Sequence, residues 1–394
     1  KYVNESGYFE ESNEEEGVFN GRFMNWATMH RLDVARIILT GGNYTNGTYY
    51  VSKTNYIGSD VFQTNTDPYK HSRSIKVPNN NVCPFNSTTY LAQIPNSRNI
   101  QFFSGDPNDY SGNSKPNAIS GNYTLRIRKQ NPDLTGIIDK FASRARFALA
   151  RFYIPDSNGD GIDDSPGNQH HGAMILVYMG NNTGDIKYKI NTMYPAQKAA
   201  PMAEALYTIA GFVQQLTSSD QDNGPKYADD AFNATLTKDP YYFPEYGTLV
   251  PCTQQNIILI SPGETDFGDS VPVGPNKVIP SIKPYPYDYK IDPSDRYLAL
   301  DTASWLHTKD LRNVSHNNNL NGTQSINLYV VRSFGINATD FYLRDIAMYG
   351  GFTDRNGDNS PVTVTSAANK ITTDWQTSEY DYDGDAAHLP DNYF

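Results

Sequence analysis

The chain has 394 residues, and its 32 Lys and Arg against 43 Asp and Glu give a net charge of −11. This acidic balance argues against a nucleic-acid binder, because such proteins follow phosphates with a basic surface. No run approaches the ~20 apolar residues that a membrane-spanning helix needs. Abundant Tyr, Gly, Pro, Asn, Ser and Thr with only 19% charged residues suits a secreted surface protein with long ordered loops.

The first strong element is a helix predicted from Gly21 to Gly42, where apolar residues recur at helical spacing and a glycine pair ends the pattern. Residues 43–131 lose this periodicity but contain short extended pieces at residues 48–53 and 74–78. Residues 122–130 alternate apolar and polar side chains, as in a half-exposed strand. Because a structureless loop of this length is improbable in a compact domain, we predict a β-rich insertion or small subdomain.

From Pro132 onward, strand and helix patterns alternate along the chain. Helices are predicted at residues 132–145, 200–216, 294–311 and 340–351, and strands at residues 146–154, 173–179, 257–260 and 326–335. The alternation predicts an α/β fold with a mostly parallel sheet that helices cover on both faces. Ile257 to Ile260 form a wholly apolar run that ends in Ser261-Pro262-Gly263-Glu264, so this strand is expected to be buried on both faces. Ligands bind at such strand ends in α/β sheets.

Three acidic loops have the composition of calcium sites. In the first loop, alternate oxygen-bearing side chains converge on one centre, a glycine allows the sharp turn, and a backbone carbonyl can add a ligand. The second and third loops repeat the alternate oxygen-bearing side chains but lack the glycine after the third ligand. The candidate ligands are Asp156, Asn158, Asp160, Asp164 and the carbonyl of Ile162 in the first loop, Asp354, Asn356 and Asp358 in the second, and Asp381, Asp383 and Asp385 in the third. The alternative is that these loops are ordinary acidic, glycine-rich turns.

The remaining reactive side chains leave alternatives open. Cys83 and Cys252 could pair in an oxidising compartment or be unrelated thiols, because only geometry decides. His170 and His171 could bind a transition metal or be an exposed pair on a loop. Asp310 and Arg312 are interpreted as loop-ordering residues. The sequence has no serine nucleophile elbow, glycine-rich phosphate loop or zinc helix, so we predict a non-enzyme.

Several segments occur in a fairly specific order. They are NGRFMNWATMHRLDVARIILTGG, RARFALARF, APMAEALYTIAGF, DPYYFPEYGTLVPCTQQNIILISPGE, YLALDTASWLHTKDLR, INLYVVRSFG, YLRDIAMYGGFTDRNGD and DYDGDAAHLPDNYF. The series, which leaves out roughly residues 43–120, resembles the N-terminal half of the type IV pilus tip-associated adhesins, the PilC/PilY group. The resemblance implies a von Willebrand factor A-like domain, a doubly wound sheet with a metal-ion-dependent adhesion site. It also implies an extracellular role at the pilus tip, with pilin or minor pilin subunits as partners and a host or abiotic surface as ligand.

On this reading, residues 1–42 form the N-terminal segment and core helix of the A-type domain, residues 43–131 an insertion, and residues 132–394 the rest of the domain. The adhesion site of the family is matched poorly. Its first ligand segment would lie upstream of Lys1, its threonine position is occupied by Ala200, and its aspartate position falls at Ser261-Pro262. Because hard cations need oxygen ligands, we predict a degenerate site. Ser261, Glu264 or Asp266 could replace the aspartate only if the loop shifted.

The resemblance implies, in addition, a central strand before Lys1 and a closing helix after Phe394. A sheet without its central strand leaves backbone groups unpaired. We hypothesise that a separately processed part of the precursor or a companion chain supplies these pieces, the alternative being that the chain is shortened or its ends are unresolved. The expected function is calcium-stabilised, non-enzymatic adhesion and pilus biogenesis. The alternatives are a structural subunit of an extracellular filament or surface layer, built by complementation of the sheet, and a metal-dependent receptor.

Overall fold

The structure is a computed structural model that describes part of the chain. The longer described segments are residues 31–41, 135–153, 172–192, 201–216, 235–261, 278–282, 293–313, 319–333, 342–352, 359–364, 371–373 and 392–394. Shorter ones are residues 2–3, 9–10, 43–45, 48–50, 75–76, 90–93, 99–103 and 118–124, with single residues 271, 273, 354 and 357. The chain divides into two compact units. Unit 1 comprises Lys1–Phe147, Gly159–Ile162 and Gly180–Gln197, and unit 2 comprises Ala148–Asn158, Asp163–Met179 and Lys198–Phe394.

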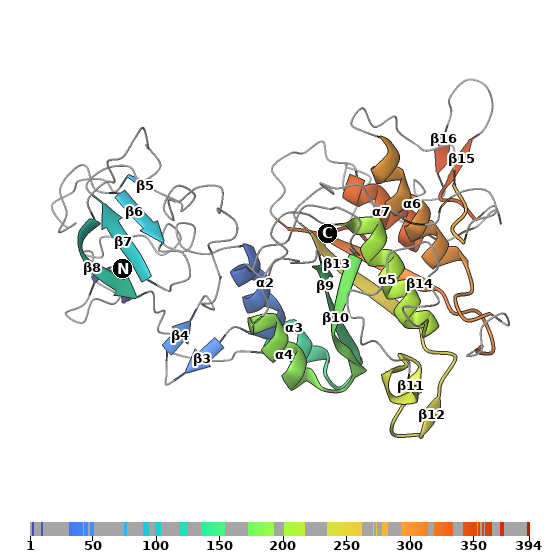
Figure 1. The fold of residues 1–394 in the computed structure, drawn as a ribbon, viewed down its shortest axis with the longest axis horizontal. Helices are drawn as coiled ribbons and strands as arrows, with labels where there is room; N and C mark the ends of the chain where they lie inside the picture. Colours follow the sequence, from blue (N-terminus) through green and yellow to red (C-terminus); the bar gives the residue numbers. More distant parts are fainter. Residues whose placement is uncertain are drawn as a thin grey trace, which may run out of the picture. The chain divides into compact units, whose positions relative to one another are not determined.

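Unit 1 contains the strand-rich part of the chain (Figure 1). Two antiparallel pairs join β1 (Tyr2–Val3) to β2 (Phe9–Glu10) and β3 (Asn43–Thr45) to β4 (Thr48–Tyr50). A four-stranded antiparallel sheet has the order β5 (Ile75–Lys76), β6 (Tyr90–Gln93), β7 (Asn99–Phe103) and β8 (Ala118–Thr124). This sheet and β3–β4 lie within residues 43–131, the segment that the sequence predicts to be β-rich.

Three helices of unit 1 pack against one another: α2 (Arg31–Thr40), α3 (Ile137–Phe141) and α4 (Thr183–Thr192). Arg36 Nε donates a hydrogen bond to the carbonyl oxygen of Ile190 at 2.9 Å, which joins α2 to α4. Lys187 Nζ lies 2.9 Å from Asp139 Oδ1, which joins α4 to α3. The sequence predicts a longer first helix, from Gly21 to Gly42, but residues 11–30 lie outside the described residues. Helix α4 was not predicted, because only Ile186 and Ile190 bury an apolar side chain on this polar helix.

Unit 2 follows the predicted alternation of strands and helices. Its main elements are β9 (Phe147–Tyr153), β10 (Gly172–Gly180), α5 (Met202–Gln214), β13 (Gln255–Ser261), α6 (Pro293–Thr308), β14 (Ile326–Arg332) and α7 (Tyr342–Gly351). Smaller elements are the 3₁₀ helix η2 (Leu236–Lys238), the hairpin of β11 (Tyr242–Phe243) and β12 (Thr248–Leu249), and the pair β15 (Val362–Val364) and β16 (Ile371–Thr373). The expected α/β class is confirmed.

The core of unit 2 lies between its helices and one face of β13–β14. These strands are parallel and in register from Gln255↔Ile326 to Ser261↔Arg332. Leu259, Leu328 and Val330 face buried side chains of α5, α6 and α7. Gly172 begins β10 with φ +136°, and a Cβ there would lie 2.5 Å from Thr208 Oγ1. Glycine therefore allows both the left-handed backbone and the close approach of β10 to α5.

The other face of β13–β14 is exposed. Ile258 is 63% exposed and its register partner Tyr329 is 37% exposed, while the core-facing residues on either side of each are buried or half-buried. The prediction that Ile257 to Ile260 would be buried on both faces is therefore wrong for the described structure. An unbroken apolar run is typical of a parallel sheet that has helices on both faces. Here α5, α6 and α7 all pack on the same face of β13–β14.

The strands of unit 2 form small sheets in the part of the chain that the structure describes. β9 pairs with β10 and β13 with β14, as two separate two-stranded sheets. The edge of β14 that faces away from β13 binds the last residues of the chain. The amide of Phe394 donates a hydrogen bond to the carbonyl oxygen of Val330 at 2.8 Å, and the amide of Arg332 donates one to the carbonyl oxygen of Phe394 at 2.7 Å. The parallel pairing of β13 and β14 agrees with the predicted mostly parallel sheet, whereas the doubly wound, von Willebrand factor A-like arrangement stays a prediction. No described helix combines the length and apolar character needed to cross a bilayer.

Candidate functional site

The predicted adhesion-site rim is described only at the end of β13. Ser261 is 1% exposed, and its carbonyl oxygen accepts a hydrogen bond from the amide of Ser333 at 2.9 Å. The ends of β13 and β14 are thus tied together, as expected for parallel neighbours. Ala200, Pro262 and Glu264 lie outside the described residues. The degenerate metal site therefore stays a prediction.

Of the calcium-type residues, the structure describes Asp354. Its Oδ1 accepts a hydrogen bond from the amide of Gly357 at 2.8 Å, and its Oδ2 accepts one from the amide of Asn359 at 3.0 Å. Gly357 and Asn359 have positive φ values of 79° and 57°, so the chain curls around this carboxylate. Each carboxylate oxygen keeps a further lone pair. The turn is therefore compatible both with a calcium site and with an ordinary acidic turn.

The other predicted ligands lie outside the described residues. They are Asp156, Asn158, Asp160, Ile162 and Asp164 of the first loop, Asn356 and Asp358 of the second, and Asp381, Asp383 and Asp385 of the third. Within the described residues, no three His, Cys, Asp or Glu side chains gather closely enough to hold a metal ion. Cys252 is exposed and forms no disulfide there, and Cys83 is not described, so their pairing also stays a prediction.

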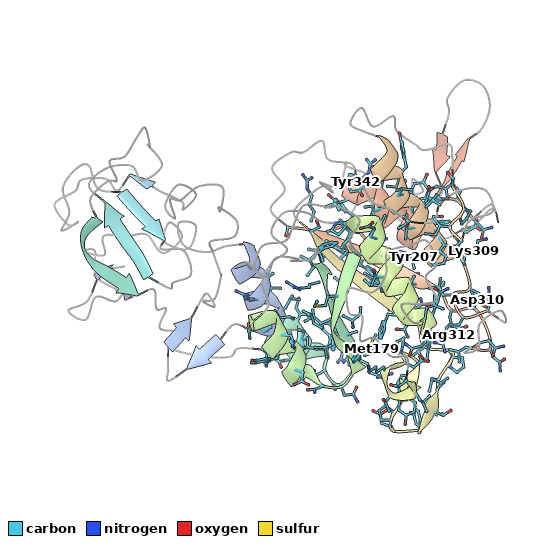
Figure 2. The ribbon with its side chains drawn as sticks, in the orientation of Figure 1. Met179, Tyr207, Lys309, Asp310, Arg312 and Tyr342 are labelled. Carbon is cyan, nitrogen blue, oxygen red and sulfur yellow. The ribbon has the colours of Figure 1, made fainter. Side chains whose placement is uncertain are left out.

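One polar cluster that the structure describes centres on Arg312, whose side chain is fully buried. Its Nη2 lies 3.0 Å from Asp239 Oδ2, and its Nη1 donates to the carbonyl oxygen of Val213 at 2.9 Å. Its guanidinium carbon lies 5.6 Å from the ring centre of Tyr241. Arg312 therefore joins the end of α5 to the segment before β11 and to the α6–β14 connection (Figure 2).

Two carboxylates order the backbone around this cluster. Asp310 Oδ1 accepts hydrogen bonds from the amides of Arg312 and Gln324, both at 3.1 Å. Asp239 Oδ1 accepts one from the amide of Tyr241 at 2.9 Å. Burial raises the pKa of Tyr241, so its phenol stays neutral. The prediction that Asp310 and Arg312 order a loop is confirmed, whereas Asp239 was missed because it lies 73 positions away from Arg312.

A second buried ion pair lies on α7. Arg344 Nη2 contacts Asp345 Oδ1 at 2.6 Å, and Arg344 Nε donates to the same oxygen at 2.9 Å. Burial raises the pKa of Asp345 well above its usual range despite this neighbouring cation. The carboxyl group is fully buried in the helix layer. The Arg312 cluster joins α5 to two loops, whereas the Arg344–Asp345 pair lies within α7. Both are buried.

Comparison with known proteins gives one family match. Residues 2–116 match the family described as "PilY1 homolog, small alpha/beta domain". The matched segment includes residues 43–116, most of the part that the resemblance to the PilC/PilY group left out. It contains β1–β7 and α2 of unit 1, whereas α3 and α4 lie beyond it. No curated protein and no solved structure matches the chain significantly. Over residues 2–116, the chain is thus similar to the small α/β domain of the PilY1 homologs.

Proposed function

We propose that this chain is a non-enzymatic, extracellular protein of the type IV pilus, associated with the pilus tip and acting in pilus assembly and adhesion. The observation that carries the proposal is the match of residues 2–116 to the PilY1 homologs. The acidic, Tyr- and Asn-rich composition supports a role outside the cell. The two described ion-pair clusters support a structural rather than a chemical use of buried charge.

The proposed mechanism is presentation of a binding surface. The segment at residues 43–131 is rich in Tyr and Asn, which offer aromatic faces and amide hydrogen bonds at low conformational cost. Its described part is an antiparallel sheet, a scaffold on which such side chains can be held in fixed positions. The degenerate rim at Ala200, Ser261, Pro262 and Glu264 would then serve as scaffold, so adhesion would not require a metal there.

The location and role can be tested together in cells that make this protein. We expect deletion of its gene to lower the number of surface pili, and antibody label on wild-type cells to lie at pilus tips. Electron microscopy with gold-labelled antibody measures both. Label along the whole pilus would favour the filament-subunit alternative, because a repeated subunit decorates a fibre throughout. Normal pili in the deletion strain together with unlabelled pili in the wild type would contradict the proposal.

Calcium is proposed to stabilise the acidic loops. We expect chelation to lower the melting temperature of the purified chain and added Ca²⁺ to restore it. A ligand at about 100 times its dissociation constant stabilises the folded state by about 2.7 kcal/mol. Differential scanning calorimetry measures the shift. The double variant Asp156→Asn/Asp160→Asn should lose the part of the response that comes from the first loop, whereas Glu245→Gln, at an exposed position outside the loops, should keep the whole response. An unchanged melting temperature after chelation would identify the loops as ordinary turns.

A further inference from the structure

Helix α3, which packs against α2 and α4 (Figure 1), exposes a face that combines apolar and basic side chains. Ile137, Lys140, Phe141 and Arg144 recur at positions i, i+3, i+4 and i+7, which lie on one side of a helix. The helical turn continues to the last of them, because the amide of Arg144 donates to the carbonyl oxygen of Phe141 at 2.9 Å. All four residues are exposed, whereas Ile138 is 5% exposed. We call these four residues the α3 face.

The apolar side chains of the α3 face are neighbours and not isolated exposed residues. Ile137 is 41% exposed and Phe141 is 45% exposed, one helical turn apart. Ile38 of α2 is 51% exposed, and the carbonyl group of the next residue, Leu39, lies close to the backbone of Gly136. Single exposed apolar side chains are ordinary, but neighbouring ones mark interaction sites. The α3 face therefore has the apolar content of a binding surface.

The basic side chains of the α3 face contrast with the charge of the whole chain. Residues 135–147 and helix α4 together contain five basic and two acidic residues, a net charge of +3 in a chain of net charge −11. Asp139 pairs with Lys187 at 2.9 Å, which joins α3 to α4 within this region. Among the described residues, no carboxylate lies within ion-pair distance of Lys140 or Arg144. The α3 face thus presents positive charge on an acidic protein.

This contrast favours a compact anionic partner over an extended anionic surface. At physiological ionic strength, charges are screened beyond about 8 Å. A polypeptide segment on the α3 face would therefore interact mainly with Lys140 and Arg144. An anionic membrane would also approach other parts of this acidic chain, which would repel it. Because Ile137 and Phe141 lie between the two cations, the partner needs apolar side chains as well as carboxylates.

We propose that the α3 face binds an acidic, amphipathic segment of a partner polypeptide. Its apolar side chains pack on Ile137 and Phe141, and its carboxylates lie beside Lys140 and Arg144. Arg144 can hold a carboxylate through two parallel hydrogen bonds, and Lys140 acts as a point charge. The charges fix the orientation of the segment, and the apolar side chains supply contact area. The proposal rests on unit 1 and holds whether or not the chain acts at a pilus.

The experiment adds a fluorescent synthetic peptide of Glu-Glu-Leu-Phe repeats to the full chain and measures binding by fluorescence polarisation. We expect high salt to weaken binding about tenfold, because it screens the charges. The control peptide has glutamine in place of each glutamate and should bind at least about tenfold more weakly. Hydrogen exchange, read by mass spectrometry, should slow in α3 when the acidic peptide is added and stay unchanged in β13 and β14.

A matched pair of charge variants tests the basic side chains. Lys140→Glu should weaken binding of the acidic peptide about tenfold, because it places a like charge on the α3 face. Lys309→Glu makes the same change in net charge at an exposed position of unit 2 (Figure 2) and should change binding less than about twofold. Both positions are exposed, so both variants should fold.

A second pair tests the apolar side chains. Phe141→Ser should weaken binding about tenfold, because it removes apolar area that the peptide would bury. Tyr246→Ser removes a 71% exposed aromatic side chain of the β11–β12 hairpin and should leave binding unchanged. Thermal unfolding followed by circular dichroism checks that both variants are folded. If Phe141→Ser does not fold, Phe141→Leu, which keeps much of the apolar area, should bind nearly as well as the wild type.

Three results would overturn the proposal. Equal effects of Lys140→Glu and Lys309→Glu would mean that the peptide responds to the overall charge of the chain. Sedimentation with phosphatidylglycerol vesicles that Lys140→Glu abolishes, together with no peptide binding, would identify an anionic membrane as the occupant. A dimer of the chain alone that Lys140→Glu dissociates would identify a second copy of the chain. Size-exclusion chromatography with light scattering detects such a dimer.

Discussion

Replacement of Arg312 with methionine is expected to lower the free energy of unfolding by about 3–5 kcal/mol, the usual cost of removing one partner of a buried ion pair. Methionine keeps much of the apolar stem of arginine but leaves Asp239 buried without its cation. The carbonyl oxygen of Val213 would also lose its donor at 2.9 Å. The expected loss is large because Arg312 is fully buried and Asp239 is 4% exposed, so water cannot replace the lost contacts.

Denaturant unfolding followed by circular dichroism measures this loss. The matched control is Lys238→Met, which removes a neighbouring cation from the same unit. Lys238 lies 4.8 Å from the ring centre of Tyr178 at a partly exposed position, so its removal should cost at most about 1 kcal/mol. The double variant Asp239→Asn/Arg312→Met should recover part of the loss, because no unpaired charge remains. An Arg312→Met protein as stable as the wild type would show that the pair does not form.

The order of elements in unit 2 could be predicted because its patterns are local and strong. Ile257 to Ile260 form an unbroken apolar run, and α5 begins after Pro201 with apolar residues all round, as expected for a buried helix. Helix α4 was missed, because its stability depends on contacts with α2 and α3 and not on its own periodicity. The prediction that β13 is buried on both faces was wrong, because whether helices cover both faces of a strand is a property of the whole sheet and not of the strand's own sequence.

The candidate site was less predictable, because its residues meet across long sequence distances. Arg312 could be assigned to a loop, but neither Asp239 nor the carbonyl group of Val213 could be identified as its partner. Asp354 shows a different limit. Its loop has the acidic, glycine-containing composition of a calcium site, yet both carboxylate oxygens accept backbone amides of the same turn. Composition alone does not distinguish an aspartate that binds calcium from one that accepts hydrogen bonds from the backbone of its own turn.

Replacement of Gly136 with alanine is expected to disrupt the packing of α3 against α2. A Cβ at this position would lie 2.2 Å from the carbonyl oxygen of Leu39 and 2.5 Å from the carbonyl carbon of Thr40. Both are backbone atoms, so no side-chain rotation can relieve the overlap. The backbone of Gly136, with φ −74° and ψ 174°, suits alanine equally well, so the overlap alone causes the effect. We expect a loss of about 1–3 kcal/mol, typical of overpacking, or more if the helices separate.

The matched control is Gly184→Ala in the first turn of α4. Its nearest neighbour would be Asn182 Oδ1 at 3.7 Å, an ordinary contact. Alanine is favoured over glycine in helices by up to about 1 kcal/mol, so this variant should be as stable as the wild type or more stable. Hydrogen exchange of α2 is compared between the two variants. Helix α2 lies within the family-matched residues 2–116, whereas α3 lies beyond them, so the comparison shows whether the matched residues depend on α3. Faster exchange of α2 in Gly136→Ala would show that the matched domain needs support from residues beyond it, and unchanged exchange would show that it is stable without α3.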